Sequence, residues 1–197
     1  MRRCFARGVP LCISAALAAA SSCSIAQVQP VAGDGLRGLY LQGGHNIVNG
    51  NDTRTLFLGY TLPRERGKPE SAVTAYWDLF YARWRGPQAN GVERSYDQVG
   101  IISMWRYRFD ERRSPWFLDY GIGLSYLDGT YSKPGSRPGG RTFGSRLNFT
   151  SRLGVGRSFG MQGRHEVSLN YQHFSNAGLK RPNPGEDFLQ LRYAYKF

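Results

Sequence analysis

The chain has 197 residues, of which 41% are hydrophobic and 14% aromatic, and it carries a formal net charge of +12. This length fits a single domain. All three cysteines lie within the first 23 residues. A chain that loses its N-terminus therefore has none, which excludes a disulfide scaffold and a thiolate metal site.

The first 26 residues have the features of a removable export signal. Three arginines among the first seven residues precede a short apolar run at 9–20, and the small residues Ser24–Ala26 form a cleavage site. The run is too short to span a bilayer as a helix. We therefore predict a signal peptide at 1–26 and a mature domain at 27–197. A retained interfacial helix and lipidation at Cys23 are the alternatives.

The mature chain has the pattern of a succession of β-strands. No apolar stripe of helical period persists, whereas segments of about ten residues alternate apolar and polar side chains between turn residues. The longest loop, 128–141, is rich in proline and glycine. Eight segments are predicted as strands, at about 36–45, 53–62, 72–84, 98–109, 116–126, 143–155, 166–175 and 187–197.

The faces of these strands indicate a membrane protein. Leu118, Ile122 and Leu124 share one face of their segment, and Asp119 lies on the other. The face opposite the apolar run carries the charges Arg106, Arg108, Asp119, Arg146, Arg152, Glu166 and Arg192. A bilayer accepts apolar side chains outside and polar ones in the lumen, and a closed barrel satisfies every backbone donor and acceptor. We predict an all-β fold, an eight-stranded antiparallel transmembrane β-barrel at 27–197. A soluble barrel or sandwich with its apolar face inward is the alternative.

The C-terminus supports this fold and sets its orientation. Phe197, preceded at two-residue intervals by Tyr195 and Tyr193, resembles the C-terminal signal of outer-membrane barrels. With both termini periplasmic, the seventh strand runs outward and the eighth returns. The positive charge then faces a phosphate-rich membrane surface rather than a nucleic acid. Arginines scattered through the lumen and loops would give the same charge without any partner.

The last two predicted strands place candidate catalytic groups at one rim. The alternation that carries Val167, Leu169 and Tyr171 continues onto His173 and Ser175, which are polar on an apolar face. Residues i and i+2 of a strand are about 6.6–6.8 Å apart at Cα, so the two side chains can lean together. Serine, histidine and a downstream acid have the chemistry of an esterase triad. Taken alone, a Ser-Asn pair at a strand end is ordinary turn chemistry.

The motif His173-Phe174-Ser175-Asn176, followed by Ala177-Gly178 and a downstream acid, resembles the PagL family of outer-membrane lipid A 3-O-deacylases. The resemblance implies hydrolysis of the 3-linked acyl chain of lipid A, without a metal or other cofactor, at the outer-leaflet rim of a Gram-negative outer membrane. It implies catalytic roles for His173, Ser175 and the acid. It also nominates the Asn176 side chain and the Gly178 N–H as oxyanion donors.

The acid is either Glu186 or Asp187. The acid of the PagL family is more typically glutamate, but ungapped spacing from the motif points to Asp187. Parity agrees, because Asp187 continues the outward series of Leu189 and Leu191 while Glu186 continues the inward series. A one-residue slip would reverse every side chain, and a bulge at Gly185 would have that effect. We predict Asp187.

Other functions stay open at this point. A passive eight-stranded barrel has no need of the motif, and a phospholipase-type barrel enzyme with Ser and His usually calls for calcium and a dimer. A homodimer is also open for a lipid A deacylase. Lys180 and Arg181, in the loop beside the motif, are candidates to pair with lipid A phosphates, although loop cations are as often solvated.

The signal-peptide assignment predicts a mature N-terminus at Gln27 and a mature chain without cysteine. N-terminal sequencing of the protein from membranes measures it. A start upstream of Cys23, or a lipid on Cys23, would show that the assignment is wrong.

Overall fold

The structure is a computed structural model that describes residues 37–48, 53–64, 71–87, 92–130, 132–133, 141–142, 145–181, 183 and 185–197. The predicted signal peptide and all three cysteines lie outside these residues. The described elements are ten strands and one 3₁₀ turn: β1 (Gly38–Asn46), β2 (Arg54–Pro63), β3 (Val73–Pro87), β4 (Glu93–Arg108), β5 (Trp116–Leu127), β6 (Ser132–Lys133), β7 (Arg141–Thr142), β8 (Leu147–Phe159), η1 (Met161–Gly163), β9 (His165–Ser175) and β10 (Glu186–Lys196).

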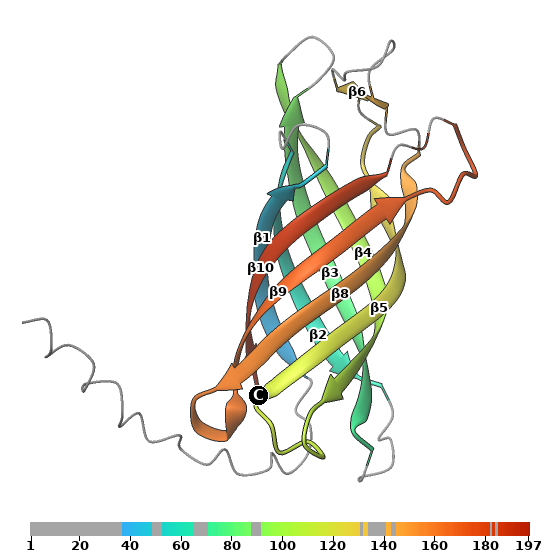
Figure 1. The fold of residues 1–197 in the computed structure, drawn as a ribbon. Coiled ribbons are helices and arrows are strands. Elements are labelled where there is room, and N and C mark those ends of the chain that lie inside the picture. The colour runs from blue at the N-terminus through green and yellow to red at the C-terminus, as the bar shows by residue number, and fades with distance from the viewer. Residues whose placement is uncertain are drawn as a thin grey trace, which may run out of the picture.

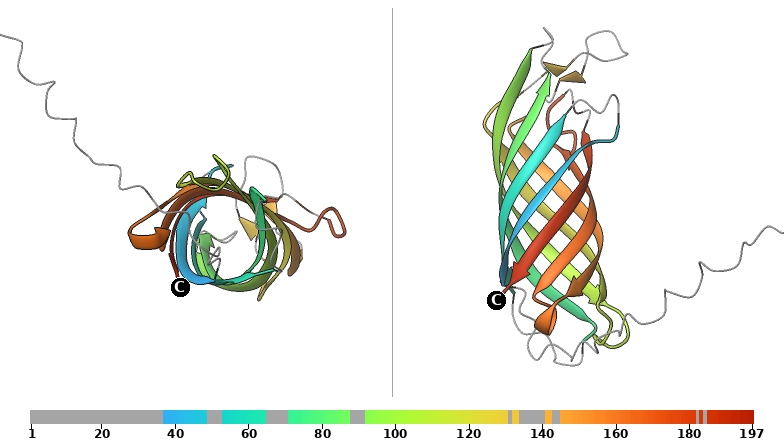
Figure 2. Two further views of the ribbon diagram at one scale, coloured as in Figure 1. Left: turned by 90° about the horizontal axis from the view of Figure 1, so that it is seen from below. Right: turned by 90° about the vertical axis from the view of Figure 1, so that its left-hand side faces the viewer.

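Eight of the strands close into one barrel, as Figures 1 and 2 show. Their order around the barrel is β1-β10-β9-β8-β5-β4-β3-β2, and β1 pairs antiparallel with both β2 and β10. Because the first and last strands pair, no barrel strand has a free edge. The predicted eight-stranded antiparallel barrel is confirmed. Among the described residues, no helix has the length and apolar character needed to cross a membrane.

The strand boundaries differ from the prediction at the end of the barrel where β9 stops and β10 begins. β3 continues through Pro87 and β4 starts at Glu93, so their ladder projects past the predicted strand ends (Figure 1). At the start of β4 the side chains of Glu93, Arg94 and Ser95 are all exposed, so no apolar-polar alternation marks this end of the strand. An exposed ion pair, Arg85–Glu93 at 2.8 Å, joins the two strands there. The short strand β6 lies within the predicted loop 128–141, and its partner β7 begins at the last residue of that loop.

The outer face of the barrel is apolar, as the alternation of apolar and polar residues predicts. Leu147 and Leu169, for example, are 52% and 47% exposed. Such side chains would be unfavourable in water but suit the hydrocarbon of a bilayer. Inward-facing residues alternate with them along every barrel strand and are mostly buried.

The lumen holds two groups of buried charges. In the first, Asp78 accepts hydrogen bonds from Tyr40 Oη at 2.6 Å, Arg152 Nη1 at 2.5 Å and Arg192 Nη1 at 2.8 Å. In the second, Arg106 binds Asp119 and Glu166 at 2.8 and 2.5 Å. Arg108 and Lys196 lie 3.6 and 3.5 Å from Glu166. Buried charges need such partners, since an unpaired ion in this setting is costly.

The predicted lumen network is therefore confirmed for six of its seven residues. The prediction for Arg146 is wrong, because its side chain is exposed and donates to Tyr126 Oη at 3.4 Å. The reason is that β8 begins at Leu147 rather than at 143, so Arg146 precedes the strand whose parity was applied to it. The prediction also missed Asp78 and Lys196, both buried in the lumen.

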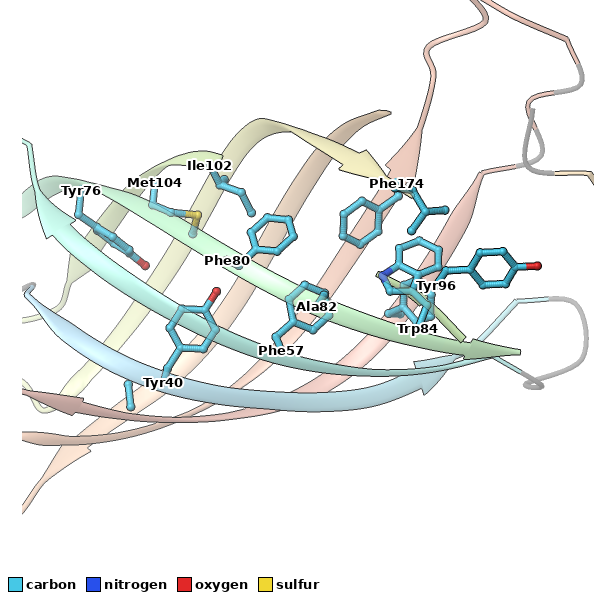
Figure 3. Close-up of a cluster of buried hydrophobic side chains, with 13 residues drawn as sticks. Tyr40, Phe57, Tyr76, Phe80, Ala82, Trp84, Tyr96, Ile102, Met104 and Phe174 are labelled. Atoms are coloured by element: carbon cyan, nitrogen blue, oxygen red, sulfur yellow. The ribbon is translucent and has the colours of Figure 1, made fainter. Parts of the chain in front are cut away.

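A cluster of buried aromatic and aliphatic side chains also packs in the lumen (Figure 3). Trp84 packs edge-on against Phe174 and Phe188, with ring centroids 5.0 and 4.9 Å away. Its indole Nε1 donates to Gln98 Oε1 at 2.9 Å. Phe174 lies between His173 and Ser175 in the sequence, and Phe188 follows Asp187. The candidate catalytic segments are thus anchored from the inside by packing.

Replacement of Asp78 by asparagine should lower the free energy of unfolding by about 3–5 kcal/mol, because it leaves two buried arginines without their shared carboxylate. Asp97→Asn is the matched control, since the Asp97 side chain is 45% exposed and pairs with Arg83 at 3.5 Å. It should cost less than about 1 kcal/mol. Denaturant unfolding in lipid vesicles measures both. Equal losses in the two variants would contradict the assignment of Asp78 as the centre of the lumen network.

Candidate active site

The register between β9 and β10 brings His173 and Asp187 together. The two residues are direct cross-strand partners, and His173 Nδ1 lies 2.7 Å from Asp187 Oδ1. Both side chains lie on the outer, apolar face, where that of His173 is 36% exposed and that of Asp187 is 16% exposed. A carboxylate only accepts, so with Asp187 ionised the hydrogen of this bond belongs to Nδ1. Nε2 is then the nitrogen that can accept a proton.

Gly185 makes room for the imidazole. Its φ is +66°, a left-handed conformation that disfavours other residues. A Cβ at this position would also lie 2.8 Å from His173 Cε1. The chain entering β10 therefore passes close beside the ring. The bulge at Gly185 that would exchange the faces of Glu186 and Asp187 is not present, because the pairing of β10 with β9 is regular from Glu186 onward.

Ser175 is the last residue of β9 and shares the face of His173. It is partly exposed, and it pairs on its other side with Phe149 of β8. In the part of the chain that the structure describes, no hydrogen bond joins its hydroxyl to His173. The strand spacing still places the two side chains next to each other at the rim.

Glu186 points the other way. It is buried at 1% exposure, and the Asn46 side-chain amide donates to its carboxylate. The adjoining backbone is held as well, because the Ile47 N–H donates to the Asp187 carbonyl at 3.0 Å. Glu186 thus ties β10 to the end of β1 from the lumen side and lies on the opposite face from His173.

The loop after β9 engages both predicted oxyanion donors. The Gly178 N–H donates to Asn176 Oδ1 at 3.0 Å, and Asn176 Nδ2 donates to the Lys180 carbonyl at 2.7 Å. The Asn176 N–H donates to Asn183 Oδ1 at 3.0 Å. Asn176 is buried, whereas a Cβ on Gly178 would meet no atom within 4 Å. In this conformation the two groups shape the turn.

One residue of the site is absent from the sequence prediction. The Tyr171 hydroxyl donates to Asp187 Oδ1, the same oxygen that His173 Nδ1 contacts. Tyr171 pairs with Leu189, which makes it the diagonal neighbour of Asp187. A diagonal neighbour across an antiparallel pair is within reach of an aromatic side chain. Once Asp187 is paired with His173, the same register places Tyr171 diagonally across from Asp187, and this pairing is the signal that could have identified Tyr171.

Among the described residues, no group of three or more His, Cys, Asp or Glu side chains is arranged to hold a metal ion. The arrangement has the parts of a nucleophile, a base and an orienting acid, drawn from a single chain.

Comparison with known proteins identifies the family. The family model described as lipid A 3-O-deacylase (PagL) matches residues 54–196. The chain belongs to the PagL family. This confirms the resemblance drawn from the motif. The chain is therefore an ester hydrolase by family, and the family places the barrel in the outer membrane of a Gram-negative bacterium.

Individual relatives agree with this assignment. The lipid A deacylase PagL of Bordetella bronchiseptica is 31% identical over 183 residues, which cover 90% of this chain and 91% of that protein. The lipid A deacylase PagL of Pseudomonas aeruginosa is 33% identical over 121 residues, 61% of this chain and 64% of that protein, so this match spans slightly less than two thirds of the relative. The crystal structure of the outer membrane enzyme PagL superposes with a TM-score of 0.62 at 26% identity, covering 81% of this chain and 99% of that one.

Proposed function

We propose that this protein hydrolyses the 3-O-linked acyl ester of lipid A by a triad of Ser175, His173 and Asp187. The observation that carries the proposal is the His173–Asp187 contact at 2.7 Å on the outer face, two residues from Ser175, in a chain of this family. All three residues come from one chain, so a homodimer is not needed to assemble the triad.

The proposed reaction has two stages. Ser175 Oγ attacks the ester carbonyl while His173 Nε2 takes its proton, and the same proton passes to the leaving 3-hydroxyl oxygen of lipid A. Water then attacks the acyl-enzyme with His173 again as base, which releases a fatty acid and restores the Ser175 hydroxyl. Asp187 holds the Nδ1–H tautomer and stabilises the imidazolium that forms in both stages.

The tetrahedral oxyanion needs donors, each of which contributes about 3 kcal/mol in well-studied enzymes. We propose Asn176 Nδ2 and the Gly178 N–H for this role. Nδ2 carries two hydrogens, and its bond to the Lys180 carbonyl uses one of them. The Gly178 N–H must exchange Asn176 Oδ1 for the oxyanion, so this part of the proposal requires the turn to open when substrate binds.

The site is proposed to work at the extracellular-leaflet rim, where the acyl esters of lipopolysaccharide begin. His173 and Ser175 lie at the end of β9, on the face that carries Leu169 and Tyr171 toward lipid. An acyl chain on the outside of the barrel would therefore reach Ser175 without entering the lumen. The exposed side chains of Lys180 and Arg181 in the adjoining loop are placed to meet lipid A phosphates.

Ser175→Ala and His173→Ala should each lower deacylation by at least about a thousandfold while the barrel still folds and inserts, since both side chains lie on the outer face and support no core contact. The measurement is mass spectrometry of purified lipid A incubated with each variant. A chelator is present throughout, because a calcium-dependent phospholipase-type enzyme would stop and a passive barrel would show no activity at all. Full activity in Ser175→Ala would exclude this serine as the nucleophile.

Asp187→Asn should lower turnover by about two to four orders of magnitude, because the imidazole loses the group that orients it and stabilises its charge. Glu186→Gln is the matched control: it removes one carboxylate from the neighbouring position but keeps an acceptor for Asn46, so its turnover should stay near wild type. The same lipid A assay compares them. The reverse ranking would mean that Glu186 is the triad acid and that β10 is shifted by one residue.

A further inference from the structure

The Asp187 carboxylate takes two donors on one oxygen. His173 Nδ1 approaches Oδ1 at 2.7 Å, and the Tyr171 hydroxyl donates to the same atom. The two donors are residues i and i+2 of β9, on one face, with Asp187 opposite His173. The acceptor is thus held by two side chains of the neighbouring strand.

A diagonal tyrosine-aspartate pair is not by itself a sign of function. Tyr81 Oη donates to Asp97 Oδ1 at 2.6 Å across β3 and β4, in the same diagonal register, and both residues face outward. The second partner of Asp97 is Arg83 at 3.5 Å. What distinguishes Tyr171 is that its acceptor oxygen is also the one that contacts the proposed general base.

The physical consequence concerns orientation. The terminal torsion of an aspartate side chain is broad, so its rotamer alone does not fix the plane of the carboxylate. Asp187 is also the shorter acid, and its Oδ1 must reach across the strands to Nδ1. A second hydrogen bond to Oδ1 restricts the carboxylate to the orientation that meets His173. A small misplacement of such a group lowers turnover strongly, because catalysis depends on alignment.

We propose that Tyr171 is a positioning residue of the active site, which holds the Asp187 carboxylate in place for His173. This inference rests on the proposed function. It assigns Tyr171 no contact with the substrate. It therefore predicts an effect on the chemical step, transmitted only through Asp187, and no effect on the binding of lipid A.

The test is a steady-state comparison of kcat and KM on lipid A in mixed detergent micelles. Tyr171→Phe removes only the hydroxyl and should lower kcat about ten- to fiftyfold, with KM within about twofold of wild type. Tyr81→Phe is the matched control, since it removes an equivalent hydroxyl from the Asp97 pair, and its kcat and KM should stay within about twofold. The mobility of unheated protein on a denaturing gel verifies that each barrel is folded.

A double-mutant cycle separates positioning from a general structural effect. In an Asp187→Ala background there is no carboxylate to hold, so the further change Tyr171→Phe should alter kcat by less than about twofold. A wild-type kcat in Tyr171→Phe, or an equal loss in both backgrounds, would overturn the role of Tyr171 while leaving the triad intact. A wild-type protein that releases no fatty acid from lipid A would instead overturn the proposed function, and the inference with it.

Discussion

The register of the closed barrel is the constraint on which the rest of the structure depends. Side chains alternate with a period of two, so a slip of β10 by one residue against β9 would turn each of its lumen side chains toward lipid. Closure between β1 and β10 and the lumen charges make such a slip costly, because Arg192 would leave Asp78 and face hydrocarbon. The pairing of His173 with Asp187 follows from this register.

The two faces of β9 and β10 differ in role: the lumen face packs against the interior of the barrel, and the outer face carries the proposed catalytic groups. Phe174 and Phe188 pack on Trp84 in the lumen, and Glu186 is bound by Asn46. The outer face carries Tyr171, His173, Ser175 and Asp187. Rigid elements hold catalytic groups more accurately than loops do, and here the strands are held by contacts on the face that substrate does not touch. The lumen packing thus supports a site that lies outside the barrel.

Much of this arrangement could be predicted from the sequence, because alternation is a local property. From alternation alone it was possible to predict the barrel and the outward orientation of Leu147 and Leu169. Alternation also placed Asp187, rather than Glu186, on the same face as His173. It failed for Arg146, where the strand boundary was misjudged. It also did not identify Asp78, because β3 carries aromatic side chains on both faces, with Tyr76 buried and Trp77 exposed, and its sequence alone does not show which face is inward. The bond from Tyr171 to Asp187 and the turn that engages Asn176 and Gly178 depend on the register between strands and on loop conformation. The sequence of a single strand specifies neither the register with its neighbour nor the conformation of the following loop.

The most direct test of the proposed triad is covalent labelling with a fluorophosphonate that carries an alkyl chain, followed by peptide mass spectrometry. Such a reagent reacts with a serine hydroxyl that a neighbouring base has activated. The proposed triad predicts a single adduct on Ser175, formed in the wild-type protein and lost in His173→Ala. An adduct on another residue, or labelling of Ser175 at the same rate without His173, would contradict it.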